Sequence, residues 1–406
     1  MRVAALLYAL GFLATVIGPE PIGPPHDSDL PVYAFYADQM LGGELPYRDF
    51  AFEYPPLAAP LLALGGVAGM GHYELVFGVI AFVLGGVVVA LTGELAARTG
   101  ADRRTGLIAA AVVVPLCGAL IRNRFDLAPV ALMLAALVLM CRERPRLGLA
   151  VLGAGALTKG FPLVVVPVAL AWLLARGERR AAAEGAVALA ATVLVIGGAA
   201  AALSADGFAD SLKYHLDRPA QVESSPAVVL TGLEVLGEGH AVTEESFGSA
   251  GVRHPDSGLV LGLFTALLAG GLVLVVGAVT VRRPPAPRQL VLASLAAVVL
   301  FAALGKVFSP QFMIWVAPLT ALAAAWRMYP LCACLVAAHL LTLLDYPFLY
   351  DDLAAGDQWA SGIVGLRNAA LVAAVALVVR ELVSPAREAA GPRWPDRLRR
   401  PRPAPR

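Results

Sequence analysis

Long apolar runs alternate with short polar segments along almost the whole chain. About eleven such runs are present, most of them roughly 15 to 25 residues long, close to the ~20 residues that a membrane-spanning helix needs. Hydrophobic residues make up 59% of the 406 residues and charged residues only 15%, whereas about a quarter of an ordinary soluble domain is charged. The pattern therefore predicts an all-α polytopic membrane protein.

Arginine clusters predict how these helices are oriented. They recur at residues 98–104, 142–146, 176–180 and 282–288, and further arginines follow Arg380. Short loops rich in arginine stay in the cytoplasm, so an even number of spans must separate successive clusters. This rule predicts about twelve spans, with both termini in the cytoplasm and outer loops at 20–72 and 204–257.

Three segments qualify this scheme. The first apolar run, residues 3–19, could be a secretory signal, but it lacks a small-x-small cleavage site and we interpret it as the first span. Residues 147–176 form either a short hairpin or a re-entrant pair. We assign residues 1–385 to one transmembrane domain and predict that 386–406, rich in Pro and Arg, is a disordered cytoplasmic tail attracted to membrane lipid.

The first outer loop combines many acidic residues with apolar periodicity. Six carboxylates fall within residues 26–56, between two apolar runs. From Asp29 the apolar residues recur at helical spacing, Pro31 suits a first helical turn, and Gly42 can end the helix. We expect a juxtamembrane helix there and a second one within residues 55–71, because both are too short to span.

Cations also gather on the predicted outer side. The three lysines, Lys159, Lys213 and Lys306, all fall there, as do Arg122 and Arg124. Charges at the tips of short hairpins are costly unless they face a cavity or a partner. The distribution suits an anionic ligand such as a phosphate at the membrane surface.

Asp29 is the most informative single acid in this region. As an N-cap it would satisfy backbone N–H groups, and as a general base it would accept a proton from a hydroxyl. Asp27 is an alternative for the second role. We expect Asp126 to pair with Arg122 or Arg124, and His339 to be a packed, hydrogen-bonded residue within its span.

Several motifs occur together in a fixed order on the predicted outer side. Asp29 and Tyr33 are followed by Gly-x-x-Pro-Tyr ending at Tyr47 and by EYPP starting at Glu53. Further along the chain come RFDLAP (124–129), TKGFP (158–162), YHLDRPAQVES (214–224) and KVFSPQFMIW (306–315). In this order the chain resembles the polyprenol-phosphate-mannose-dependent α-(1,2)-mannosyltransferases of the GT-C glycosyltransferase superfamily, from about residue 3 to 383.

The resemblance implies a GT-C-like bundle and a defined chemistry. Such enzymes move a sugar from a lipid-phosphate carrier to an acceptor hydroxyl on the outer face, with an acid of the first outer loop as base, which is the place of Asp29 here. The departing phosphate needs a fixed cation, and the candidates are Lys306, Lys159, Arg124, Arg122, Arg218 and His215. The candidates for binding the acceptor or the sugar are Tyr33, Tyr47, Glu53, Gln311 and Glu223.

Other functions are less well matched by the pattern. A transporter or flippase is the main alternative, but it would place polar residues near the middle of its spans rather than at one face. An arabinosyltransferase or a glycan ligase would have a similar composition. We expect no metal, although His26, Asp27 and Asp29 lie close in sequence, and no nucleotide or nucleic acid, because no phosphate-binding glycine motif is present. The expected partners are membrane lipid, a polyprenyl-phosphate sugar donor and a glycolipid or glycan acceptor.

Overall fold

The computed structural model describes residues 1–23 and 28–384. The alternative base Asp27 and the predicted tail 386–406 lie outside these residues. The chain is 75% helical, which confirms the predicted all-α class. A small sheet in the region 204–257 was not predicted.

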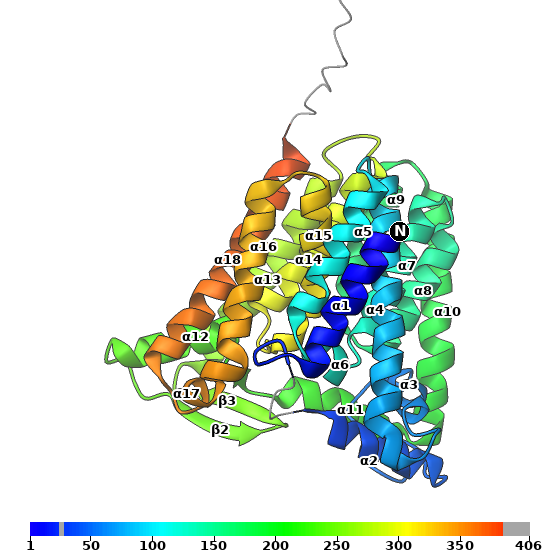
Figure 1. Cartoon of the computed structure of the whole chain (residues 1–406). Helices are drawn as coiled ribbons and strands as arrows, with labels where there is room; N and C mark the ends of the chain where they lie inside the picture. Colours follow the sequence, from blue (N-terminus) through cyan, green and yellow to red (C-terminus); the bar gives the residue numbers. More distant parts are fainter. Residues whose placement is uncertain (24–27, 385–406) are drawn as a thin grey trace, which may run out of the picture.

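Long helices form the frame of one bundle (Figure 1). Six segments of the described chain are long and apolar enough to cross a membrane, in agreement with a multi-pass membrane protein; the predicted number of about twelve spans stays a prediction. These segments contain α4 (Tyr73–Arg98), α10 (Arg179–Leu203), α13 (Ser257–Val279), α14 (Pro287–Leu304), α16 (Tyr329–Leu344) and α18 (Gln358–Val383).

Shorter helices complete the bundle. They are α1 (Arg2–Ile17), α5 (Arg103–Val113), α7 (Leu127–Cys141), α8 (Pro145–Thr158), α9 (Val166–Ala175) and α15 (Met313–Ala325). At 1.5 Å per residue, α8 is about 18 Å shorter than α4. The predicted hairpin 147–176 is indeed a helix pair, α8 and α9, whose helices are each shorter than the roughly 30 Å hydrocarbon core.

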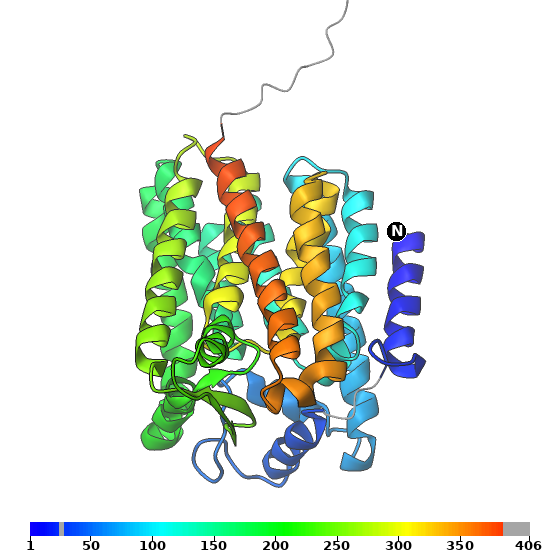
Figure 2. The same cartoon turned by 90° about the vertical axis from the view of Figure 1, so that its left-hand side faces the viewer.

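The bundle has a buried centre and an exposed periphery. The apolar window of α14 is 78% buried, whereas those of α10 and α13 are 6% and 11% buried. A surface helix with an apolar outer face is expected where lipid replaces water as the solvent. The amino terminus and the carboxyl end of α18 point toward the same end of the bundle, as the arginine clusters predict (Figures 1 and 2).

The opposite end carries the loops and the small elements (Figure 1). The first predicted juxtamembrane helix is confirmed as α2 (Leu30–Leu41), and the second is the shorter α3 (Ala58–Leu64), which ends at two successive glycines. The region 204–257 contains α11, α12 and an antiparallel sheet of order β1-β3-β2. Their bounds are α11 (Ala205–Asp217), β1 (Ala220–Gln221), α12 (Ser225–Val235), β2 (Val242–Ser246) and β3 (Ser249–Arg253).

Single turns make the tips of the helical hairpins. The short helix α6 (Leu120–Asn123) precedes α7, and 3₁₀ turns precede α4, α6, α9 and α15; α16 continues through a wide turn, η5, into α17. The bounds of these elements are η1 (Met70–His72), η2 (Pro115–Cys117), η3 (Phe161–Val165), η4 (Pro310–Phe312), η5 (Asp345–Leu349) and α17 (Tyr350–Ala354).

Candidate active site

Asp29 stands at the start of α2, as predicted, but its side chain does not cap the helix. One carboxylate oxygen, Oδ1, forms an ion pair with Nη1 of Arg124. The other oxygen, Oδ2, accepts a hydrogen bond from the Tyr33 hydroxyl at 3.2 Å. The Asp29 side chain is 35% exposed, so the carboxylate lies at an accessible edge of the site and is free of a purely structural duty to the helix backbone.

Arg124 is held in place from a second direction. The residue is extended between α6 and α7, and its side chain is only 11% exposed. Its Nε donates to Oε1 of Gln311 at 2.8 Å, and the Ser309 hydroxyl donates to the same oxygen at 2.8 Å. The start of α2, the turn before α7 and the turn before α15 therefore meet at one guanidinium group.

Asp126 belongs to a neighbouring, more deeply buried group. Both of its carboxylate oxygens lie 2.8 Å from Lys159 Nζ, and Oδ1 also accepts a 2.6 Å bond from Trp315 Nε1. The predicted pairing of Asp126 with Arg122 or Arg124 is wrong, because the Arg124 guanidinium turns toward α2 while the tip of the α8–α9 hairpin brings Lys159 to the start of α7. The Lys159 ammonium also lies 4.8 Å from the centre of the Phe125 ring.

Lys306 binds the backbone at the carboxyl end of α11. Its ammonium donates to the backbone oxygens of Leu216 and Arg218, and burial lowers its pKa. Arg218 donates to the Ser249 hydroxyl at 2.7 Å. The ring of His215 contacts the Glu53 backbone oxygen at 2.9 Å, which ties α11 to the first outer loop.

Burial of the His215 ring lowers its pKa. The imidazole is therefore more often neutral near pH 7 than an exposed histidine would be. In this state it is a hydrogen-bonding group rather than a fixed cation. Arg122, in α6, packs against α4 near Gly78. The nearby acid of α4 is Glu74, whose negative charge favours the charged form of the Arg122 guanidinium.

An aromatic wall backs the Asp29–Arg124 pair. Tyr33 is fully buried, with its ring centre 5.6 Å from those of Phe77 and Phe125 and 6.0 Å from that of Tyr54. Burial and the neighbouring Asp29 charge raise the pKa of Tyr33 well above its ordinary value, so the hydroxyl keeps the proton that it donates. The Tyr47 hydroxyl donates to the Tyr54 backbone oxygen at 2.6 Å.

Glu223 belongs to a separate buried cluster, and two of its partners were not found from the sequence. Arg367 Nη1 lies 2.7 Å from Asp345 Oδ2 and 3.9 Å from Glu223 Oε1, and all three side chains are at most 1% exposed. Gln221 donates to Glu223 at 2.9 Å. Arg367 is an ionisable residue inside an apolar run, a signal that marks a functional or structural role in membrane helices and that could have singled it out.

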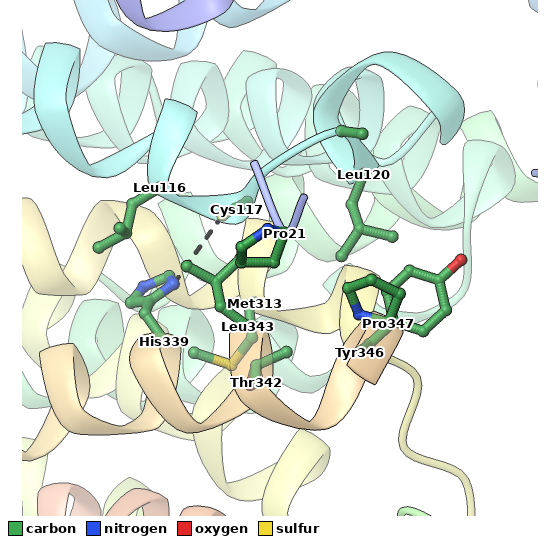
Figure 3. Close-up of a pocket in the computed structure, with 11 residues that line it drawn as sticks. Pro21, Leu116, Cys117, Leu120, Met313, His339, Thr342, Leu343, Tyr346 and Pro347 are labelled. Carbon is green, nitrogen blue, oxygen red and sulfur yellow. Dashed lines mark hydrogen bonds between the residues drawn. The ribbon is translucent and has the colours of Figure 1, made fainter. Parts of the chain in front are cut away.

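A narrow apolar pocket opens beside η2 (Figure 3). His339 lies in its wall, 3.9 Å from Cys117 and 3.2 Å from the Thr320 hydroxyl, which confirms the prediction of a packed, hydrogen-bonded histidine. No candidate site residue lines the pocket. We therefore place the candidate active site at the Asp29–Arg124 pair and not in this pocket.

No group of three or more His, Cys, Asp or Glu side chains suited to a metal occurs in the parts of the chain that the structure describes, 1–23 and 28–384. His26 and Asp27, which raised the question of a metal, lie outside those parts. The independence from a metal stays a prediction.

The six long apolar helices indicate a multi-pass membrane protein. The sequence model of glycosyltransferase family 87 matches residues 52–310, more than half of the chain. The chain belongs to glycosyltransferase family 87. This confirms the predicted enzyme class, a glycosyltransferase, and leaves the GT-C superfamily, mannose and the polyprenyl-phosphate donor as predictions.

The chain also shows similarity to a solved structure. The apo crystal structure of ArnT from Cupriavidus metallidurans aligns with 94% of this chain and 77% of its own, with a TM-score of 0.43 and 14% sequence identity. No curated protein matches the sequence.

Proposed function

We propose that this glycosyltransferase moves a mannosyl residue from a polyprenyl-phosphate carrier to an acceptor hydroxyl on the outer face of the membrane. The observation that carries the proposal is the Asp29 carboxylate beside the Arg124 guanidinium, at the end of the bundle opposite both described chain ends. Sugar transfer from a lipid phosphate needs a proton acceptor and a cation within one site. Asp29 and Arg124 are such a pair.

The two residues divide the reaction between them. The Asp29 carboxylate accepts the proton of the acceptor hydroxyl while the hydroxyl oxygen forms a bond to the anomeric carbon of the sugar. The bond between that carbon and the phosphate oxygen breaks, and the phosphate leaves with the electron pair. Arg124 meets the charge that develops on the phosphate, which lowers the barrier because the cation is already in place. Attack opposite the leaving phosphate inverts the anomeric centre.

Arg124 is our choice of phosphate ligand because it is the cation paired with the proposed base. The Lys306 ammonium is engaged by two backbone oxygens and the Lys159 ammonium by the Asp126 carboxylate. Arg124 presents a planar group with several donors, which suits phosphate oxygens. In this proposal Lys159, Lys306, Arg122 and Arg218 contribute to the positive potential around Arg124, and His215 holds α11 in place through its hydrogen bond.

The acceptor has polar groups available next to the base. Tyr33 and Gln311 flank the Asp29–Arg124 pair from opposite sides, while Tyr47 and Glu53 lie on the same loop and approach α11. Glu223 does not contact the acceptor in this proposal, because its side chain is fully buried in the Arg367 cluster. Side-chain cations neutralise the leaving phosphate, so the proposal needs no metal and no nucleotide.

The test is sugar transfer by the purified full-length protein in lipid nanodiscs. We expect it to consume polyprenyl-phosphate-mannose in the presence of a membrane glycolipid extract and to release polyprenyl phosphate. We expect no transfer of mannose from GDP-mannose. Polyprenyl-phosphate-glucose and polyprenyl-phosphate-arabinose are the matched controls for the sugar. Transfer of arabinose instead of mannose would overturn the choice of sugar, and transfer from GDP-mannose would overturn the choice of carrier. Solute flux without any transfer would favour the transporter, which the family assignment argues against.

A further inference from the structure

Both oxygens of the Asp29 carboxylate are engaged within the protein. Oδ1 is paired with Arg124 and Oδ2 accepts the Tyr33 hydrogen bond. A carboxylate has about four acceptor sites, and the two partners of Asp29 occupy one on each oxygen, so an acceptor hydroxyl has to share the carboxylate with Arg124 and Tyr33. The base is therefore partly masked in this structure.

The cation that masks the base is the proposed ligand of the donor phosphate. Arg124 is fixed on its other edge, where Nε donates to Gln311 at 2.8 Å and Ser309 supports the same amide oxygen. The ion pair with Asp29 uses Nη1 of the guanidinium. A phosphate that binds this edge competes with Asp29, since an arginine fork binds a phosphate with two parallel hydrogen bonds.

The difference in exposure decides which partner moves. The Arg124 side chain is 11% exposed and has contacts on both of its edges. The Asp29 side chain is 35% exposed, and Asp29 is the residue that immediately precedes α2. Rotation of the Asp29 side chain therefore costs little packing. Movement of Arg124 would break the contact to the turn before α15 and leave a charged group poorly paired inside the protein.

We propose that the Asp29–Arg124 ion pair is a mask on the catalytic base, and that the phosphate of the lipid donor removes it by taking Arg124 from Asp29. The base then becomes free only in the donor complex, so the donor binds before the acceptor is activated. This inference rests on the proposed function for the roles of the two residues. The competition between a carboxylate and a phosphate for Arg124 does not depend on which sugar is transferred.

The inference predicts that loss of the base strengthens binding of the lipid phosphate. Asp29→Asn removes the charge that competes for Arg124, so we expect undecaprenyl phosphate to bind about fivefold more tightly than to the wild type, the effect of an ion pair of about 1 kcal/mol. The measurement is equilibrium binding of undecaprenyl phosphate to the full chain in nanodiscs, with no sugar present. A second arm with inorganic phosphate separates the headgroup from the lipid chain, and the same direction of change is expected there.

Matched variants isolate the pair. Asp38→Asn removes the same charge from an exposed position on the same helix, and we expect it to leave binding unchanged. In an Arg124→Gln background, where binding is weak, we expect Asp29→Asn to have no further effect. Equal or weaker binding by a folded Asp29→Asn protein would overturn the inference, as would a gain that persists without Arg124 or that Asp38→Asn reproduces.

The outcome is separable from that of the proposed function. If the wild type transfers no sugar but Asp29→Asn still binds the lipid phosphate more tightly, the mask stands and the proposed reaction falls. If the wild type transfers mannose and Asp29→Asn binds no better, the reaction stands and the mask falls. A melting temperature measured on each variant identifies any loss of binding that comes from unfolding.

Discussion

Two carboxyl groups share one buried guanidinium group near the small sheet. Glu223 and Asp345 are both buried, and Arg367 is the cation between them, stacked 3.8 Å from the centre of the Phe308 ring. Burial and the nearby Asp345 charge raise the pKa of Glu223 well above its ordinary value. Glu223 therefore holds its proton to a higher pH than an exposed glutamate does, and in that form the cluster has balanced charge.

A pH dependence of stability follows from this shift. The folded state holds the Glu223 proton and the unfolded state releases it above its ordinary pKa, so the free energy of unfolding falls as the pH rises from about 4.3 toward the raised value. Glu223→Gln mimics the neutral acid. We expect it to match the wild-type melting temperature at about pH 4, where the wild type holds the proton in both states, and to show a smaller decline of the melting temperature from there to pH 9.

A second substitution at Glu223 supplies the contrast. Glu223→Ala leaves the buried Gln221 amide without its acceptor, while Arg367 keeps Asp345, and we expect it to lower the free energy of unfolding by about 1–3 kcal/mol. Thermal melting in detergent measures both variants, with the exposed Glu238→Gln as the reference for a surface charge. Equal losses in Glu223→Gln and Glu223→Ala would contradict a protonated Glu223.

At the scale of elements, α11 is the part that most closely connects the outer loops. A Cβ atom on Gly207, in its first turn, would lie 2.0 Å from the backbone oxygen of Tyr47. Its last turn is capped by Lys306, and His215 contacts the Glu53 backbone oxygen. The close approach of α11 to the first outer loop thus depends on a position that has no side chain.

Gly207→Ala is expected to displace α11 from this loop. Overpacking against a backbone atom costs about 1–3 kcal/mol, and the shift carries His215 and Arg218 with it, so we expect a loss of transfer of about tenfold together with a lower melting temperature. The control is Gly232→Ala in α12, where a Cβ atom meets nothing within 4 Å. Steady-state transfer and thermal melting compare the two. If both variants behave like the wild type, the contact between Gly207 and Tyr47 does not position α11.

At the scale of the whole molecule, the apolar runs and the arginine clusters were sufficient to predict most of the helices. They predicted a helix over 30–41 and a helix pair within 147–176, and the structure confirms both; the described chain ends lie at one end of the bundle, and their cytoplasmic placement stays a prediction. The periodicity of apolar residues predicts the secondary structure of a segment, and the positions of arginines predict on which side its loops lie. Both can be determined from one segment alone, which is why they were sufficient for these features.

The partners of individual side chains were not predictable in the same way. Asp126 pairs with Lys159 across a helical hairpin, and Lys306 binds the backbone of α11 about ninety positions away along the chain. Such contacts depend on how helices of different length pack, which no local pattern encodes. Asp29 and Arg124 were each found as candidates, but only the fold shows that they form one pair.

The most direct test of the central claim is mannosyl transfer by Asp29→Asn in nanodiscs, compared with Asp27→Asn and the exposed Asp38→Asn at matched expression and melting temperature. A general base contributes about 10² to 10⁴ to the rate, so we predict a loss in this range for Asp29→Asn and near wild-type transfer for the other two. Undiminished transfer by Asp29→Asn would contradict the account, and a loss confined to Asp27→Asn would move the base to that residue.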